Sequence, residues 1–500
     1  MLGKHETIHG SWNSQLTFVL AATGAAVGLA NLWKFPYLAG VHGGGFIIAY
    51  ALCLLLVGIP VVMAEVALGR QGRKSPIGSI NALVVRAGSA RAWKSIGILA
   101  VISGFLILTL YSVVGGMALA YVFSSAFGEF VGGQPGQVVD VLRRLESSPS
   151  YFSSWHTLFL LLVVVVLARG VNRGLEKAAR ILFPMMVILI SVLLLFSMRH
   201  GEMERAVNFL FTLRKLTPQA WMDALGHAFF TLGIGAGAMM VYGAYMPGRA
   251  KIGRLMLTVA LLDLLVAVAA GLVIFPILFV GHLEPIAGFG LIFHSAPLAY
   301  STLEGGQFMS VIFFVLVTFA AWSSAIAVME PAVAWCVEKF NVNRRFATLL
   351  VAIAAWGVGV AAILSFSSWQ HVQLYGINVF NGLDIVTSRL LLPVCGLLIA
   401  LYAGWFLKKE FIGEQFANYQ SWFFSLWRLI LRWFAPLAVV TIFFVNLFEL
   451  RHDLCEKDHR RAFCSAGVEV SAASTSVSKP TLDEGINSDA HEATTPSPSD

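Results

Sequence analysis

Charged side chains are scarce in this sequence. Asp, Glu, Lys and Arg make up 12% of its 500 residues, whereas a soluble domain carries about 25%. Hydrophobic residues make up 58%, and the mean hydropathy is +0.78. The apolar runs are continuous, as in LLLVGIPVVMAEVAL and LFLLLVVVVLA, and do not alternate with polar residues. This pattern excludes a soluble domain and a spanning β-barrel, and it predicts an all-α polytopic membrane protein.

Cysteine is also rare, and its spacing excludes a disulfide scaffold and a metal cluster. Cys53, Cys336 and Cys395 lie in or beside apolar runs, and we interpret them as packing residues. Cys455 and Cys464 lie together in the polar tail, where a disulfide and two free thiols are both open alternatives.

Several functional signals are missing as well. The apolar runs contain no His/Asp spacing typical of a metal site and no activated nucleophile, so the sequence does not predict an enzyme. No small-residue cleavage site follows the first apolar run, which we interpret as a spanning helix. Loops that orient the chain account for the formal charge of +7, so we expect no nucleic-acid partner and no organic cofactor.

Hydropathy predicts about eleven spanning helices. They lie near residues 15–40, 44–68, 95–126, 155–169, 179–198, 220–246, 253–281, 305–338, 346–366, 376–407 and 429–449. Basic residues gather in alternate loops, for example Arg70, Arg73 and Lys74, while 282–304 and 367–375 contain none. Because basic loops stay inside, we expect a multi-pass protein of the plasma (inner) membrane with a cytoplasmic N-terminus.

Two segments outside the spans have a distinctive composition. The outer loop 282–304 contains apolar patches and two prolines, and it is predicted to fold down onto the protein as a cap. The tail from about Ser465 is rich in Ser, Thr, Ala and Pro, and it is predicted to be disordered.

Glycine clusters interrupt the first and sixth spans. They occur in Gly24–Asn31 (GAAVGLAN) and in Thr231–Gly237 (TLGIGAG). Glycine costs a helix interior about 1 kcal/mol relative to alanine, so each cluster is a weak point. Close packing of helices through small residues is the ordinary explanation. The corresponding positions of the two clusters, in spans one and six, favour a pair of broken helices at a transport site.

Three segments carry a resemblance to a known family. The run GLANLWKFP with the following GGG, the run FFTLGIGAGAMMVYGAYM and the run FAAWSSAIAVMEP resemble the neurotransmitter:sodium symporter family, in particular its bacterial amino-acid transporters. The resemblance covers about residues 9–407. It implies two inverted five-helix repeats, with helices 1 and 6 unwound mid-membrane and an accessory helix 11.

The resemblance also divides the chain into regions. These are a cytoplasmic N-terminal segment with an inner gate (1–14), a first repeat (15–198), an outer loop (199–219), a second repeat (220–407), a loop with helix 11 (408–449) and a polar tail (450–500).

Two sodium sites follow from the resemblance. The first would use the carbonyl of Ala26, the carbonyl and hydroxyl of Thr231, the amide oxygen of Asn31, Asp263 and the substrate carboxylate. The second would use the carbonyls of Gly24, Val27 and Ala320 with the hydroxyls of Ser323 and Ser324. Oxygen donors suit a hard cation, and unwound backbone supplies them without added charge. Hydrogen bonding between helices is the alternative role of the two serines.

Asp263 is notable on chemical grounds alone. An acid inside an apolar run is a functional candidate by default. The alternative is that Asp263 lies at the end of a helix, where its carboxylate reaches water. The apolar residues on both sides, Leu257–Leu262 and Leu264–Leu272, argue against that alternative. Many members of the family have asparagine here and need chloride. An aspartate supplies the negative charge itself, so we expect transport without chloride.

The resemblance also implies an amino-acid site. Tyr111 and Phe230 match an aromatic lid, and the unwound turns around Ala26, Gly28 and Thr231 would bind the charged groups of the substrate. The side-chain pocket would be lined by Ile107, Gly233, Ala236, Ser324 and Val328. Gly233 and Ala236 are small, which favours a larger apolar or aromatic substrate.

Two gates complete the resemblance. Lys34 and Asp384 match an outer ion-pair gate in which arginine is usual, and lysine lacks the two-pronged contact. Glu338 matches the inner acid, but His9 stands where the family has arginine, so we hypothesise a pH-sensitive inner gate. His227 replaces a common outer glutamine.

The sequence therefore predicts a sodium-coupled symporter of small amino acids in the lipid bilayer, with two sodium ions as the co-transported species. A proton-coupled transporter on the same fold and a non-transporting sensor are the alternatives. The substrate's identity and the oligomeric state, monomer or dimer, stay open.

Overall fold

The computed structural model of the protein describes residues 10–132, 135–247, 250–285, 288–416 and 419–457. One compact unit comprises Met1–Glu449, and a separate unit comprises Leu450–Asp500. The predictions for His9, for Cys464 and for the tail beyond residue 457 lie outside the described residues, as does the side chain of Cys455.

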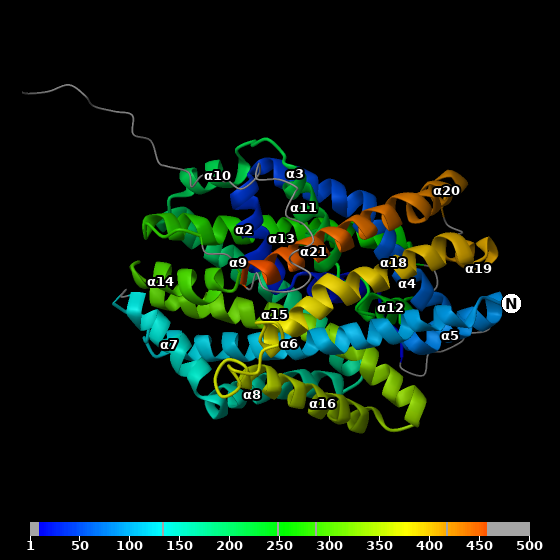
Figure 1. The fold of residues 1–500 in the computed structure, drawn as a ribbon, viewed down its shortest axis with the longest axis horizontal. Coiled ribbons are helices and arrows are strands. Elements are labelled where there is room, and N and C mark those ends of the chain that lie inside the picture. The colour runs from blue at the N-terminus through cyan, green and yellow to red at the C-terminus, as the bar shows by residue number, and fades with distance from the viewer. Residues whose placement is uncertain (1–9, 133–134, 248–249, 286–287, 417–418, 458–500) are drawn as a thin grey trace, which may run out of the picture. The chain divides into compact units, whose positions relative to one another are not determined.

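Helices account for the membrane segments of the described chain (Figure 1). Nine continuous segments are long and apolar enough to cross a membrane, and the pair α1 and α2, bent by 59°, makes a tenth. The pair α11 and α12 supplies the remaining predicted span. In chain order the spans are α1 (Gln15–Ala26) with α2 (Leu29–His42); α3 (Gly44–Cys53), η1 (Leu54–Gly58) and α4 (Ile59–Gly72); η2 (Arg91–Lys94) and α6 (Ser95–Ala126); α8 (Pro149–Leu167); η3 (Val171–Leu175) and α9 (Glu176–His200); α11 (Pro218–Thr231) with α12 (Ala238–Ala244); α13 (Ile252–Val280); α15 (Gly306–Phe340); α16 (Arg344–Leu364); α17 (Val379–Asp384), η5 (Ile385–Leu391), α18 (Leu392–Leu401) and η6 (Tyr402–Phe406); and α20 (Ser421–Leu429), η8 (Ile430–Phe434) and α21 (Ala435–Lys457).

Shorter helices form the connections. They are α5 (Pro76–Ala87), α7 (Pro135–Ser147), α10 (Met203–Phe211), η4 (Leu291–Ser295), α14 (Ala296–Ser301), α19 (Lys409–Gly413) and η7 (Glu414–Phe416). The outer segment with η4 and α14 buries Leu291, Ile292 and Phe293, and the Phe289 ring lies 4.9 Å from that of Trp33. The predicted cap is thereby confirmed.

Some predicted boundaries were wrong. The fourth and fifth spans begin at Pro149 and Val171, earlier than predicted, and the last span begins at Ser421. The first turns of the fourth and fifth spans are polar, so a hydropathy window excludes them. Proline occupies the first position of α8. It suits that position because an N–H group there would have no intrahelical acceptor, so its absence costs nothing.

The first helix breaks at Val27 and Gly28. The Val27 N–H donates to the Thr23 carbonyl at 2.7 Å, and the Gly28 N–H donates to the Ala26 carbonyl at 2.8 Å. Gly28 is then extended, with φ −105° and ψ −165°. A Cβ at Gly28 would lie 2.9 Å from the Ser324 hydroxyl, so glycine is needed for the close approach of α15.

The sixth helix breaks over six residues between α11 and α12. Gly233, Gly235 and Gly237 have φ of +61°, +84° and +76°. This left-handed region is accessible to glycine without the steric cost that other residues meet. The glycine cluster therefore unwinds this helix, as the sequence predicts.

Two long helices hold these breaks in place. α6 and α15 pack along one another more extensively than any other pair of described elements, and they run lengthwise in Figure 1. A Cβ at Gly104 of α6 would lie 2.5 Å from the Ala236 carbonyl and 3.0 Å from the Val328 carbonyl. Gly104 thus brings α6 to backbone contact distance of both the unwound segment before α12 and α15.

Glycines also let α4 approach α12. A Cβ at Gly69 would lie 1.8 Å from the Met240 carbonyl oxygen, and one at Gly243 would lie 2.3 Å from the Val66 carbonyl oxygen. Such contacts are typical of helices that associate through small residues in membranes.

This contact gives a test of the packing. We expect Gly69→Ala to lower the thermal unfolding midpoint in detergent, because overpacking a close contact costs about 1–3 kcal/mol. Gly357→Ala is the matched control, since Gly357 lies in α16 with no atom within 4 Å of an added Cβ. An unchanged midpoint for Gly69→Ala would show that α4 and α12 do not require this approach.

Candidate functional site

A buried carboxylate lies where the two breaks meet. Asp263, in the middle of α13, accepts hydrogen bonds at Oδ1 from Asn31 Nδ2 (2.7 Å) and Thr231 Oγ1 (2.9 Å). Its Oδ2 accepts from the Tyr50 hydroxyl at 2.8 Å. Asn31 belongs to the first turn of α2 and Thr231 is the last residue of α11. All four side chains are buried.

The same residues form an oxygen cluster. Thr231 Oγ1 lies 3.0 Å from Asn31 Oδ1 and 2.9 Å from Asp263 Oδ1. Amide, hydroxyl and carboxylate oxygens are the ligands that hard cations prefer. Ala26, the other predicted ligand, lies in the adjacent break, where its carbonyl accepts the Gly28 N–H. The structure therefore brings together the side chains of the first predicted sodium site.

A second oxygen cluster lies between α1 and α15. Ser323 Oγ donates to the carbonyls of Gly24 (2.6 Å) and Ala320 (3.1 Å). Ser324 Oγ is 3.2 Å from the Ala25 carbonyl. Val27, the remaining predicted ligand of this site, is the residue that follows α1.

The predicted aromatic lid lies above this region. A cavity of about 50 Å³ is lined by Ile107, Tyr111 and Phe230. A Cβ at Gly28 would lie 3.4 Å from the Tyr111 hydroxyl, which places Tyr111 beside the first break. Ala236 and Val328 contact α6 at Gly104, three residues before Ile107. Gly233 has open space where a side chain would be.

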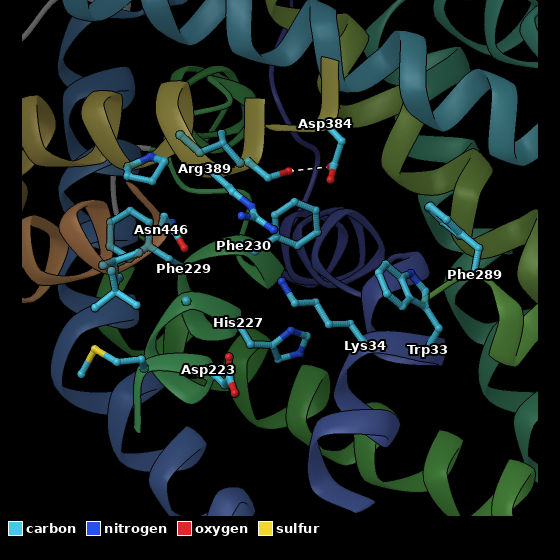
Figure 2. Close-up of a pocket in the computed structure, with 17 residues that line it drawn as sticks. Trp33, Lys34, Asp223, His227, Phe229, Phe230, Phe289, Asp384, Arg389 and Asn446 are labelled. Carbon is cyan, nitrogen blue, oxygen red and sulfur yellow. Dashed lines mark hydrogen bonds between the residues drawn. The ribbon is translucent and has the colours of Figure 1, made fainter. Parts of the chain in front are cut away.

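A larger cavity of about 360 Å³ opens beyond Phe230 (Figure 2). Lys34, Phe230 and Asp384 line it, and the Lys34 ammonium lies 5.5 Å from the centre of the Phe230 ring. The Asp384 carboxylate accepts a hydrogen bond from Ser388 at 2.8 Å, drawn as the dashed line in Figure 2. Phe230 is among the residues that line both cavities. An ion pair between Lys34 and Asp384 stays a prediction.

His227 also lines the outer cavity and lies between aromatic rings. Its ring is 5.0 Å from that of Tyr50 and 5.7 Å from that of Phe35, and its side chain is fully buried. It therefore packs on the tyrosine that holds Asp263.

The opposite side of the site is closed by the N-terminal segment. Trp12 donates from Nε1 to the Tyr242 carbonyl (3.0 Å) and from its backbone N–H to the Tyr245 carbonyl (2.9 Å). Its ring also makes edge contacts with both tyrosine rings. These bonds cover two carbonyls at the end of α12, that of Tyr242 and that of the C-cap residue Tyr245.

Two acids stabilise this closed side. Glu338, the predicted inner-gate acid, accepts hydrogen bonds from the backbone N–H and the hydroxyl of Ser75, where α5 begins. Glu330 is fully buried, and it accepts from the Tyr245 hydroxyl and pairs with Arg344. Sequence reasoning missed Glu330, although an acid inside an apolar run is its own signal.

Glu65 and Tyr50 were missed as well. Glu65 is fully buried in α4, and its Oε2 accepts the Gly235 N–H at 3.1 Å, so it holds the unwound segment before α12. The rule that selected Asp263 also selects Glu65. Tyr50 carries no such signal, because a tyrosine in an apolar helix is ordinary.

Comparisons with known proteins find similarity to sodium-dependent transporters. The model of the sodium:neurotransmitter symporter family matches residues 9–133 and 148–471. The sodium-dependent transporter YhdH of Bacillus subtilis is 33% identical over 439 residues, which cover 86% of this chain and 96% of YhdH. The human sodium-dependent neutral amino acid transporter SLC6A17 is 26% identical over 300 residues, 54% of this chain and 40% of that protein.

A solved structure agrees with them. The structure of MhsT in complex with L-phenylalanine superposes with a TM-score of 0.78 at 32% identity, covering 87% of this chain and 99% of MhsT. The predicted fold class, an all-α membrane protein with broken helices 1 and 6, is thereby confirmed.

The hydrogen bond from Tyr50 to Asp263 can be tested directly. We expect Tyr50→Phe to lower the free energy of unfolding by about 1.5–3 kcal/mol, because one oxygen of a buried carboxylate loses its donor. The control is Tyr300→Phe, since the buried Tyr300 hydroxyl has no hydrogen-bond partner among the residues that the structure describes. Thermal unfolding of both variants in detergent measures the difference. Equal midpoints would mean that the bond to Asp263 contributes nothing.

Proposed function

The chain belongs to the sodium:neurotransmitter symporter family, and from this we propose that it imports apolar or aromatic amino acids together with sodium by alternating access. Members of the family are transporters, not enzymes. The observation that carries the proposal is the oxygen cluster of Asn31, Thr231 and Asp263, which is buried where the two broken helices meet.

The first sodium ion binds at this cluster. Its ligands are the side-chain oxygens of Asn31, Thr231 and Asp263, with backbone carbonyls of Ala26 and Thr231. A cation there balances the charge that Asp263 carries in a buried place. The second ion binds near Ser323 and Ser324, in the cluster between α1 and α15, with carbonyls of Gly24, Val27 and Ala320.

The amino acid binds between these ions and Phe230. Its carboxylate meets the break at Gly28, beside Tyr111, and its side chain extends toward Gly233, Ala236 and Val328. The open space at Gly233 favours a large side chain. MhsT, which shares the fold, was solved with L-phenylalanine, and this supports an aromatic substrate.

In the proposed transport cycle, the side of the site with the larger cavity is open first, and the side closed by Trp12 opens later. Sodium and substrate enter through the outer cavity between Lys34 and Asp384, and Phe230 then closes over them. The Trp12 contacts with α12 open afterwards. Each positive charge that moves through 100 mV releases about 2.3 kcal/mol, so two sodium ions support strong accumulation.

Uptake into proteoliposomes tests the proposal. We expect a labelled aromatic amino acid to accumulate with an inward sodium gradient and not with potassium, because the buried oxygen cluster completes the substrate site only when the cation is bound. A proton gradient that drives uptake equally well without sodium would contradict sodium coupling. Binding of the amino acid without flux would instead identify a sensor.

Chloride gives a second test. Asp263 provides the negative charge inside the site, so we expect uptake by the unchanged protein to be the same in chloride and in gluconate. Asp263→Asn removes this charge, and its uptake should fall at least about tenfold in gluconate and be partly restored by chloride, since about 1.4 kcal/mol corresponds to a factor of ten. A strict chloride requirement in the unchanged protein would contradict the role given to Asp263.

A further inference from the structure

Two arginines converge on one carbonyl at the end of the tenth span. Arg428 of α20 donates from Nε to the Gly404 carbonyl at 3.0 Å, and Arg432 of η8 donates from Nε to the same oxygen at 2.8 Å. Arg428 also donates from Nη2 to the Leu407 carbonyl at 2.9 Å. Two guanidinium groups are therefore neighbours beside the last turn of η6.

Helix capping accounts for one of these charges but not for both. Carbonyls at the end of a helix attract a cation. A second cation four residues along the same helix repels the first, and it does so more strongly in a medium of low dielectric constant. Among the described residues, no acid forms an ion pair with Arg428 or Arg432. Glu410, an exposed residue of α19, attracts Arg428 without reaching ion-pair distance.

One donor of this pair has no acceptor. Arg428 is only 6% exposed, and its buried Nη1 has no hydrogen-bond partner in the described part of the chain. Arg432 is half-buried and uses Nε for the Gly404 carbonyl. A buried donor without a partner is costly, and a phosphate accepts two-pronged bonds from guanidinium groups. The two adjacent positive charges and the unused Nη1 donor of Arg428 thus favour an anion.

The surroundings identify the source of that anion. The rings of Trp405 and Trp433 lie 5.1 Å apart and are 44% and 59% exposed, and the Arg432 guanidinium lies 5.3 Å from the Trp405 ring. Exposed tryptophans mark the boundary between lipid and water. The exposed Lys408 and Lys409 follow directly, on the side where basic loops gather and anionic lipids attract them.

We propose that Arg428 and Arg432 bind the phosphate of an anionic phospholipid headgroup at the cytoplasmic junction of η6 and α20. The lipid's acyl chains would run along the exposed tryptophans Trp405 and Trp433. This site lies apart from the ion and substrate sites, so it does not depend on the proposed transport activity.

Lipid binding to the purified protein tests the proposal. Phosphatidylglycerol or phosphatidylcholine is added to the full chain in mild detergent, and bound lipid is counted by native mass spectrometry. We expect phosphatidylglycerol to bind at least ten times more tightly than phosphatidylcholine and to raise the thermal unfolding midpoint. We expect Arg432→Gln to lose this preference, and Arg432→Lys to keep part of it, because lysine retains the charge but lacks the planar two-pronged contact.

Arg345→Gln is the matched control, because Arg345 is exposed in α16 and its loss should leave the lipid preference unchanged. Equal binding of the two lipids to the unchanged protein would overturn the proposal, and so would an unchanged preference in Arg432→Gln. Inorganic phosphate that stabilises the protein as well as phosphatidylglycerol does would also overturn it, since the site would then bind a free anion. Because the readout is lipid binding, absence of sodium-driven uptake would leave the result standing.

Discussion

The carboxylate of Asp263 is the point on which the arrangement of helices depends. Moving a carboxylate into a medium of low dielectric constant costs about 20 kcal/mol in the idealised limit. Three hydrogen bonds to a charged group, from Asn31, Tyr50 and Thr231, return about 1.5–3 kcal/mol each. In real proteins the effective cost is several kcal/mol, which bonds of this number and strength can offset. The three donors come from α2, α3 and α11, so the carboxylate of α13 joins both broken helices.

The unwound backbone creates a similar requirement. Breaking a helix frees N–H and C=O groups that water cannot reach in a membrane, and each needs a partner. Glu65 accepts the Gly235 N–H, and the Ser323 hydroxyl donates to the Gly24 carbonyl. Close glycine contacts bring α4 and α12 near enough for the first of these bonds. The polar groups around the breaks are thus explained by the breaks before any ligand is considered.

The sequence predicted the spans well because a membrane helix must be apolar throughout. It predicted the starts at Pro149 and Val171 poorly, because polar first turns at the interface resemble loops. Asp263 was found as an acid in an apolar run. Tyr50 was not, since its role depends on a hydrogen bond across 213 residues of chain, and no local pattern encodes that distance. The partners in the oxygen clusters came from the family resemblance and not from composition.

Contacts among the described residues hold the side of the site beside Trp12 closed. Residue 9, where the family has arginine, lies outside the described residues, but Trp12 bonds to the carbonyls of Tyr242 and Tyr245, and Glu330 is paired with Arg344 and bonded to Tyr245. Glu338, the acid expected to meet residue 9, is already bonded to Ser75. Hydrogen bonds and one ion pair among the described residues therefore keep this side closed. Opening this side requires Trp12 to leave the carbonyls of Tyr242 and Tyr245, at the end of the broken sixth helix.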